Sequence, residues 1–410
     1  MVNITGVGNN SLFVLIGALS LLLSGCSPDE LQVVDLQLEC AVTGEQGLAV
    51  RAWVPSEAQN RFSHGTSVVL RVAGAGTSGF TQTFSPLDLT KQGVGVMQYL
   101  SPGTSSESFS SGGVEAFYAD SEVEAISCVL EHLNDDAEPF VGVSAVVATG
   151  ISIGGNSLLN AVVNGGAPVD GVSLWESPLI DQLVLEEPSV GGSLDPDYKP
   201  GHCTLDDGCL FDHWEQVLAY DVDSSLLYRD DNLNGVLDLN EPLYEYRETN
   251  LGEPVYSKKM TRSAEQWVFG GQFPNGWLSG EEVDQFWIYR DAADALTSVR
   301  DEGSTVPYIY IATGVDHVQL VHDHVILAQE GLIGADFFRL NPDAAYREAI
   351  GEDGSLDLPA GDLLMGHEAL SMLPEGRSGA MVLAGELELI DRVQTGAWDP
   401  DLDQVITWME

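Results

Sequence analysis

The sequence predicts an α/β fold in which a mostly parallel sheet is flanked by helices and interrupted by a large cap or lid insertion. Residues 141–148 form a Val-rich apolar run, which is typical of a strand buried on both faces. Strand-like and helix-like segments alternate on both sides of a central region, as expected for a parallel sheet. The central region, residues 179–303, is rich in Asp, Gly, Pro and Tyr and lacks this alternation.

The individual elements follow from local periodicity. Alternating runs at 32–42 and 48–54 flank a glycine-containing turn, which predicts an antiparallel pair at a sheet edge. Before the insertion we expect further strands at 67–73, 94–100 and 170–176, and a helix at 116–133. After it we expect strands at 306–312 and 336–340, and helices at 318–330 and 379–393. The core would therefore comprise residues 26–178 and 304–410.

The charge balance excludes one class of partner. The 410 residues include 63 Asp and Glu against 16 Lys and Arg, which gives a formal net charge of -47. A nucleic acid is not an expected partner, because phosphate binding requires positive charge. A strongly acidic, hydrated surface suits salty surroundings or an exported protein, and a cationic partner is the alternative.

The N-terminus predicts export. Residues 12–23 form an apolar segment too short to span a bilayer as a helix. The sequence Leu23-Ser-Gly-Cys26 that ends it resembles a bacterial lipobox, which implies removal of residues 1–25 and lipidation of Cys26. Ser27 resembles the outer-membrane sorting pattern of two-membrane bacteria, so a lipid anchor in the cell envelope is expected. An ordinary cleaved signal peptide is the alternative.

Four cysteines remain in the mature chain, and an even number in an exported protein predicts two disulfides. Cys203 and Cys209 close a short loop and are the favoured pair, which would leave Cys40 to pair with Cys128.

A serine stands at the corner of a predicted strand–turn–helix unit. Gly150-Ile-Ser152-Ile-Gly154 follows the Val-rich strand and precedes a segment with helical periodicity. This context is that of a nucleophile elbow, in which flanking glycines let strand and helix approach closely. The amide of Ile153, at the start of the helix, would face an anion. A purely structural turn is the alternative.

The elbow and the order of elements resemble the α/β-hydrolase family over most of residues 32–178 and 304–394. The resemblance implies a nucleophile, an acid and a histidine in that chain order. Ser152 matches the nucleophile, and Asp316, just after the 306–312 strand, matches the acid. Glu176 is a rival acid at the end of the preceding strand. His367 matches the base better than His317, His322 or His324, which follow Asp316 too closely.

The resemblance also implies a second oxyanion donor in the loop after the 67–73 strand. Ala75 occupies that position, so its amide and that of Ile153 would together bind the oxyanion of a tetrahedral intermediate. The glycines around Ala75 are equally compatible with a flexible loop.

The insertion contains a calcium-loop pattern. Residues 230–241 fit D-x-[DN]-x-[DN]-G-x5-E at every position. The predicted ligands are Asp230, Asn232, Asn234, the carbonyl of Val236, Asp238 and Glu241. Pro242 follows directly, so the pattern resembles an EF-hand loop without its helix pair. The expected ion is a structural Ca²⁺, and an acidic turn without an ion is the alternative.

The expected activity is hydrolysis of a carboxylic ester. A serine peptidase or another acyl hydrolase is the first alternative, and a calcium-braced surface lipoprotein without catalysis is the second. Six aromatic residues late in the insertion would line an apolar pocket or form the insertion's own core: Trp267, Phe269, Phe273, Trp277, Phe286 and Trp287.

Overall fold

The fold is described by a computed structural model of the chain. It describes residues 31–56, 59–74, 80, 85–106, 109–114, 120–135, 138–140, 142–179, 289–312, 323–343 and 377–397, and short stretches between 189 and 259. Within these residues, no helix is both long and apolar enough to cross a membrane. The predicted signal segment and Cys26 lie outside the described residues.

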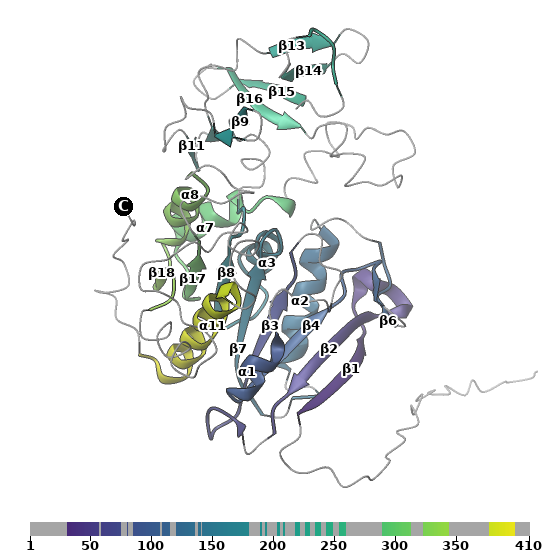
Figure 1. Cartoon of the computed structure of the whole chain (residues 1–410), viewed down its shortest axis with the longest axis vertical. Coiled ribbons are helices and arrows are strands. Elements are labelled where there is room, and N and C mark those ends of the chain that lie inside the picture. Colours follow the sequence, from purple (N-terminus) through teal and green to yellow (C-terminus); the bar gives the residue numbers. More distant parts are fainter. Residues whose placement is uncertain are drawn as a thin grey trace, which may run out of the picture.

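An eight-stranded, mostly parallel sheet forms the centre of the molecule (Figure 1). Its strands, in spatial order, are β1 (Gln32–Leu38), β2 (Leu48–Val54), β4 (Val94–Tyr99), β3 (Thr66–Val72), β7 (Val143–Ile151), β8 (Gly171–Trp175), β17 (Tyr308–Ile311) and β18 (Phe338–Leu340). The two pairs that involve β2 are antiparallel, and all others are parallel. The predicted fold class and the antiparallel edge pair are confirmed.

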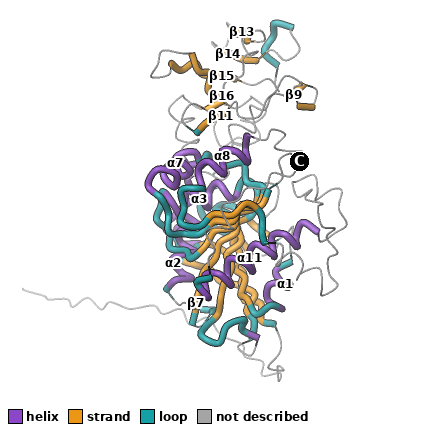
Figure 2. Tube along the Cα trace, turned by 90° about the vertical axis from the view of Figure 1, so that its left-hand side faces the viewer, coloured by secondary structure: helices purple, strands orange, loops and turns teal. Residues whose placement is uncertain are grey.

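Helices cover both faces of this sheet (Figure 2). One face carries α2 (Asp120–Asn134), α3 (Gly154–Val163), α7 (Ala293–Glu302) and α8 (Asp323–Leu332). The other face carries α1 (Pro86–Lys91) and α11 (Arg377–Thr395). Strand residues alternate between the two layers, so that Val68 and Leu70 pack in one and Val69 in the other. Both faces are therefore buried, which is why the central strands read as continuous apolar runs.

Two of these helices differ from the expectations. Helix α1 was not predicted, because its six residues are too few to show a helical period; Ser85 caps it with a hydrogen bond from the Leu87 amide. Helix α7 lies within the range assigned to the insertion, yet its Leu296 and Val299 are buried in the layer that also holds α3 and α8. The insertion limits at 179 and 303 stay a prediction.

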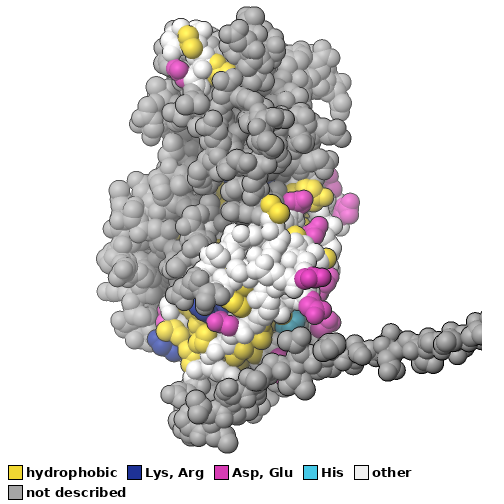
Figure 3. All heavy atoms as spheres, turned by 90° about the vertical axis from the view of Figure 1, so that its right-hand side faces the viewer, with side chains coloured by type: hydrophobic (Ala, Val, Ile, Leu, Met, Phe, Trp, Pro, Cys, Tyr) yellow, Lys and Arg dark blue, Asp and Glu magenta, His cyan; other side chains and the backbone are white. Residues whose placement is uncertain are grey.

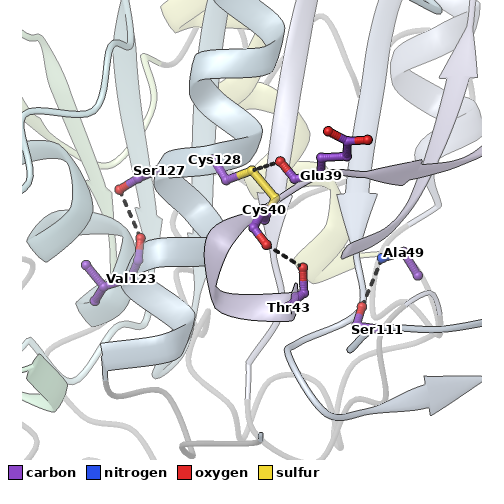
Figure 4. The surroundings of a disulfide bond; sticks show 8 residues. All are labelled: Glu39, Cys40, Thr43, Ala49, Ser111, Val123, Ser127 and Cys128. Carbon is purple, nitrogen blue, oxygen red and sulfur yellow. Dashed lines mark hydrogen bonds between the residues drawn. A yellow bond between two sulfur atoms is a disulfide. The ribbon is translucent and has the colours of Figure 1, made fainter. Parts of the chain in front are cut away.

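A disulfide joins Cys40 to Cys128 on α2 (Figure 4). Cys40 precedes a short 3-10 helix, η1 (Ala41–Gln46), and the Thr43 hydroxyl donates a 2.9 Å hydrogen bond to the Cys40 carbonyl. The bridge ties the connection between β1 and β2 to a helix 88 residues further along the chain. One of the two predicted disulfides is thereby confirmed.

The insertion contains short antiparallel strands. They are β9 (Ser189–Val190), β10 (Ser193–Leu194), β11 (Cys203–Thr204), β12 (Gly208–Cys209), β13 (Leu218–Asp221), β14 (Leu226–Arg229), β15 (Leu243–Glu248) and β16 (Pro254–Lys259). Strands β13 to β16 form a four-stranded sheet, which lies at the top of Figure 1, above α7 and α8. Cys203 and Cys209 are directly opposite each other in the β11–β12 pair. A small hairpin of β5 (Ser105–Ser106) and β6 (Phe109–Ser110) lies earlier in the chain.

Candidate active site

The predicted corner exists, and Ser152 occupies it. Strand β7 ends at Ile151 and helix α3 begins at Gly154. Between them Ser152 has a φ of 51°, a left-handed conformation that residues other than Gly, Asn and Asp rarely adopt. Its side chain is half-buried. Such a conformation concentrates at functional sites, where the surrounding structure holds it in place.

Glycines let the strand and the helix meet around this serine. A β-carbon at Gly150 would lie 2.3 Å from the Cα of Gly155, and one at Gly154 would lie 2.3 Å from the carbonyl oxygen of Ala73. Both distances are far shorter than real contacts, so neither position accepts a side chain without movement of the backbone. Gly150 therefore lets β7 and α3 approach closely, and Gly154 lets the start of α3 approach the chain just after β3.

The loop after β3 passes beside Ser152. A β-carbon on Gly74 would lie 2.9 Å from the Cβ of Ser152 and 2.8 Å from the carbonyl oxygen of Ile151. Gly74 immediately precedes Ala75, the predicted second oxyanion donor, which lies outside the described residues. The chain that leads to Ala75 thus reaches the elbow.

Three strained residues mark the same edge of the sheet. The described residues other than glycine with positive φ are Ser152, Glu176 (41°) and Asn341 (66°). Each follows the last residue of a parallel strand, namely β7, β8 and β18 respectively. Carboxyl ends of parallel strands meet at one edge, where ligands bind in open α/β sheets. Backbone strain is concentrated where the sequence predicted chemistry.

Asn341 joins two segments that lead to predicted catalytic residues. Its side-chain amide donates a 3.1 Å hydrogen bond to the carbonyl oxygen of Ala312, and its Oδ1 accepts a 3.0 Å bond from the Ala312 amide. The chain continues from Ala312 to Asp316, and from Asn341 to His367, which lies within residues 344–376. Asp316 and His367 lie outside the described residues, so their roles remain predictions.

Glu176, the rival acid, lies directly beside the elbow. The Ser152 amide bonds to the carbonyl oxygen of Trp175, the residue before Glu176, and the Glu176 amide bonds to Ile311. The Glu176 side chain is fully buried. Its Oε2 is 3.9 Å from Nε2 of His324, a buried residue at the start of α8. That distance exceeds a hydrogen bond, so the two groups attract each other as a buried pair only when the histidine is protonated.

His324 was set aside by the sequence reasoning as too close to Asp316. The structure gives it a position at the carboxyl edge, near Glu176. The burial of His324 follows from the amphipathic pattern of α8, which can be seen in the sequence. Its proximity to Glu176 cannot be seen there, because the two residues are 148 positions apart. His317 and His322 lie outside the described residues.

Helix α3 also bonds to the segment that leads into the predicted insertion and to residues 289–291 late in it. Asn156 lies about one turn after Ser152. Its side-chain amide donates hydrogen bonds to the carbonyl oxygens of Pro178 (2.6 Å) and Arg290 (3.1 Å). Asn160, one turn further, bonds to Tyr289 and Asp291. The chain leaves and returns beside the helix that starts at the elbow. Sequence reasoning missed both asparagines, because on a helix they resemble ordinary polar residues.

Part of the predicted calcium loop is described. Gly235 has a φ of 72°, the sharp bend expected of the pattern, and the Val236 amide donates to Oδ1 of Asn234 at 2.7 Å. The Asn234 amide nitrogen donates to Oδ2 of Asp238 at 2.9 Å. Asp230, Asn232 and Glu241 lie outside the described residues, as do the six aromatic residues of the late insertion. Within the described residues no cluster of three or more His, Cys, Asp or Glu is placed to hold a metal.

Comparison with known proteins gave distant structural likenesses. No protein-family model and no curated protein matches the sequence. An esterase of Pyrococcus furiosus is similar over 81% of this chain and 91% of its own, with 10% identity and a TM-score of 0.42. Est1E from Butyrivibrio proteoclasticus is similar over 75% and 87%, with 11% identity and a TM-score of 0.37.

A third solved structure, the α/β hydrolase GrgF from Penicillium sp. sh18, is similar over 76% of this chain and 88% of its own, with 13% identity and a TM-score of 0.35. These likenesses are distant. The α/β-hydrolase fold class rests instead on the mostly parallel sheet, the helices on both faces and the serine at a strand–turn–helix corner.

Proposed function

We propose that the chain is a serine hydrolase that cleaves a carboxylic ester through an acyl-enzyme on Ser152. The observation that carries the proposal is the conformation of Ser152, whose φ of 51° is imposed at a corner where two glycine positions exclude side chains. A nucleophile elbow requires this geometry, because it presents the hydroxyl away from the strand and the helix.

The proposed reaction follows the triad mechanism. Ser152 Oγ attacks the carbonyl carbon while His367 takes its proton, and Asp316 orients the imidazole. The amides of Ile153 and Ala75 stabilise the oxyanion of the tetrahedral intermediate. His367 then gives the proton to the departing alkoxide, so that the alcohol is released and the acyl group stays on Ser152. His367 then takes a proton from a water molecule, which attacks the acyl carbonyl; the acid product leaves, and His367 returns the proton to Ser152 Oγ.

Labelling tests the nucleophile. A fluorophosphonate probe should tag the wild-type chain, and peptide mapping should locate the tag on Ser152. Ser152→Ala should remove the tag and the turnover. Ser127→Ala is the matched control, because Ser127 lies on α2 and donates to the Val123 carbonyl of its own helix. Absence of any tag on wild type would favour the alternative of a surface lipoprotein that performs no catalysis.

Substrate class is tested next. Esters of small acids should be turned over faster than the corresponding amino-acid amides, because no segment of the sequence indicates a peptide-binding domain. Faster turnover of the amides would establish the serine-peptidase alternative. In the same assays, His367→Ala should remove turnover while the melting temperature is kept; retained turnover would assign the base to another histidine.

The acid is assigned by paired variants. Asp316→Asn should lower kcat by roughly 10⁴-fold, the size expected when the histidine tautomer is no longer fixed. Glu176→Gln should retain most of the turnover if Asp316 is the acid. The reverse pattern would make Glu176 the acid, which its burial beside the elbow also permits.

We further propose that residues 230–241 bind a structural Ca²⁺. The bend at Gly235 and the proximity of Asn234 to Asp238 fit the loop, whose oxygen ligands would be Asp230, Asn232, Asn234, Val236, Asp238 and Glu241. Calcium should raise the melting temperature of wild type but not that of Glu241→Gln. An equal response of both would place the ion elsewhere or exclude it.

The lipid anchor is also a proposal. Cys26 would carry the acyl groups and hold the enzyme at the cell envelope, facing small ester substrates and not nucleic acid. Metabolic labelling with an alkyne fatty acid should modify wild type but not Cys26→Ser. Labelling of neither would support an ordinary signal peptide.

A further inference from the structure

A buried ion pair crosses from the central sheet to helix α11. Nε of Arg71 and its Nη2 donate to the two carboxylate oxygens of Glu386 at 2.8 and 2.7 Å. The Thr149 hydroxyl donates to the same carboxylate at 2.9 Å. All three residues are buried, and the charged side chains are 2% and 0% exposed. We refer to Arg71, Thr149 and Glu386 as the buried triplet.

The buried triplet is a polar row in an apolar layer. Arg71 and Thr149 are register partners on the parallel strands β3 and β7, so their side chains lie on the same face. The surrounding layer consists of apolar residues from the sheet and from α11, including Val69, Val147, Met381, Val382 and Ile390. A charge placed there loses its hydration and requires a close partner with good geometry.

Each member of the buried triplet belongs to an element that leads to a part of the proposed site. Thr149 is three residues before Ser152, and Arg71 is four before Ala75. Glu386 lies on the helix that follows the segment with His367. The strands that lead to Ser152 and to the proposed oxyanion donor thus meet the helix that follows the His367 segment in one set of hydrogen bonds.

The contacts of α11 show in which direction this helix runs along the sheet. Asp391, five residues after Glu386, is bonded at two points to Arg61, which precedes β3. Gln394 donates to Ser67 and Ser144 near the amino ends of β3 and β7. Helix α11 therefore runs from the carboxyl edge, where Ser152 lies, toward the amino edge.

Stability alone does not require the buried triplet. A buried ion pair loses hydration energy of the same order as its attraction, and well-packed apolar residues of similar volume often serve as well or better. The bidentate contact instead fixes position, because the planar guanidinium and the carboxylate match in only one orientation. The hydrogen bond from the Thr149 hydroxyl fixes the Glu386 carboxylate relative to β7 as well.

We infer that Arg71, Thr149 and Glu386 are positioning residues, which set the register of α11 against β3 and β7 and so align the proposed base and oxyanion donor with Ser152. The inference rests on the proposed function. It concerns geometry rather than folding, so its signature is a loss of kcat in a chain that remains folded.

The test is the double variant Arg71→Met/Glu386→Leu. We expect kcat and the rate of fluorophosphonate labelling to fall by about 10- to 100-fold, since misplacement of about 1 Å can cost 10²-fold. KM should change less than kcat, and the melting temperature should stay the same or rise. Thr149→Val is the second variant, nearly isosteric, and should lower both rates while the chain stays folded, even if the double variant fails to fold.

The matched control is Arg61→Met/Asp391→Leu. This pair is also bidentate and also ties α11 to the sheet, but at the amino edge. It should leave kcat and labelling unchanged. Wild-type rates in both the double variant and Thr149→Val, or an equal loss in the control, would overturn the inference. A wild-type chain that is never labelled would instead refute the proposed function.

Discussion

The amide of Ser152 donates a 2.9 Å hydrogen bond to the carbonyl oxygen of Trp175. Strands β7 and β8 are in parallel register up to Ile151 and Trp175, so this bond extends their pairing one residue further, onto the serine itself. The backbone of Ser152 is therefore fixed by the neighbouring strand at the point where the chain turns into α3. Strain at the serine is held in place by sheet hydrogen bonds.

Gly150→Ala should disrupt this corner. Its β-carbon would lie 2.3 Å from the backbone of Gly155, so strand and helix must separate. We expect a loss of stability of about 1 to 3 kcal/mol, typical of overpacking, and loss of labelling at Ser152. Gly171→Ala in β8 is the control, because its β-carbon would meet nothing closer than 3.4 Å. Urea unfolding and labelling measure both; equal effects would contradict the steric explanation.

Two substitutions of Asn341 should distinguish what its hydrogen bonds contribute to stability from what its left-handed backbone conformation costs. Asn341→Gly tolerates the φ of 66° but loses both bonds to Ala312, which we expect to cost roughly 1 to 3 kcal/mol. Asn341→Ala loses the same bonds and also keeps a β-carbon in the left-handed region without the polar side chain of asparagine, at a further cost of roughly 1 kcal/mol relative to glycine. Denaturant unfolding compares the two. An alanine variant as stable as the glycine variant would show that the backbone relaxes.

Removal of the Cys40–Cys128 disulfide should strongly destabilise the fold. The bridge spans 88 residues, and chain entropy predicts a loss of roughly 4 to 5 kcal/mol for Cys40→Ala/Cys128→Ala. Cys203→Ala/Cys209→Ala is the comparison. A bridge there would close a much shorter loop, and its removal should cost roughly 2 kcal/mol of stability. Thermal unfolding without reductant ranks the variants, and a larger loss in the second pair would reverse the prediction.

Glu388 should make stability depend on pH. Burial raises the pKa of its carboxyl, although the Asp343 amide, Arg339 and Arg392 act in the opposite direction. The folded state then holds the proton more tightly than the unfolded state, in which the pKa is about 4.3. This contribution to stability is fully present below the unfolded pKa and is lost as pH rises through the folded pKa.

The Glu388 effect is measured against Glu388→Gln, which stays neutral. Relative to wild type, the variant should become more stable as the pH of urea unfolding rises from about 4 through that window. Glu131→Gln, on an exposed position of α2, controls for removal of one negative charge. A stability difference between Glu388→Gln and wild type that is independent of pH would show that Glu388 does not titrate differently in the two states.

Salt should stabilise the protein. The net charge of -47 makes the folded chain repel itself, and the described surface agrees with this. In Figure 3, Asp and Glu side chains gather along the right-hand flank of the described surface, while Lys and Arg appear at its lower left. An increase in NaCl shortens the screening length from about 10 Å at 0.1 M to about 3 Å at 1 M. The melting temperature should rise, measured with EDTA present to exclude calcium. A flat or falling profile would contradict the prediction.

Much of the fold was accessible from sequence because its signals are local. The strands around Val69, Val147 and Ile309 are buried on both faces and read as apolar runs, while α2 shows a clear helical stripe. The elbow was accessible for the same reason, since Gly150, Ser152 and Gly154 are adjacent in the chain. Helix α1 was missed because six residues carry too little periodicity, and α7 because it follows an irregular region.

The sequence by itself determined the fold class, the corner that carries Ser152 and the acidic character of the surface, since each depends on neighbouring residues or on composition. Only the tertiary structure decided that Asn341 joins the segments leading to Asp316 and His367, and that Arg71 meets Glu386 across 315 positions. Contacts of this kind depend on how the strands are ordered and how the helices cross them, and that order leaves no local trace in the chain.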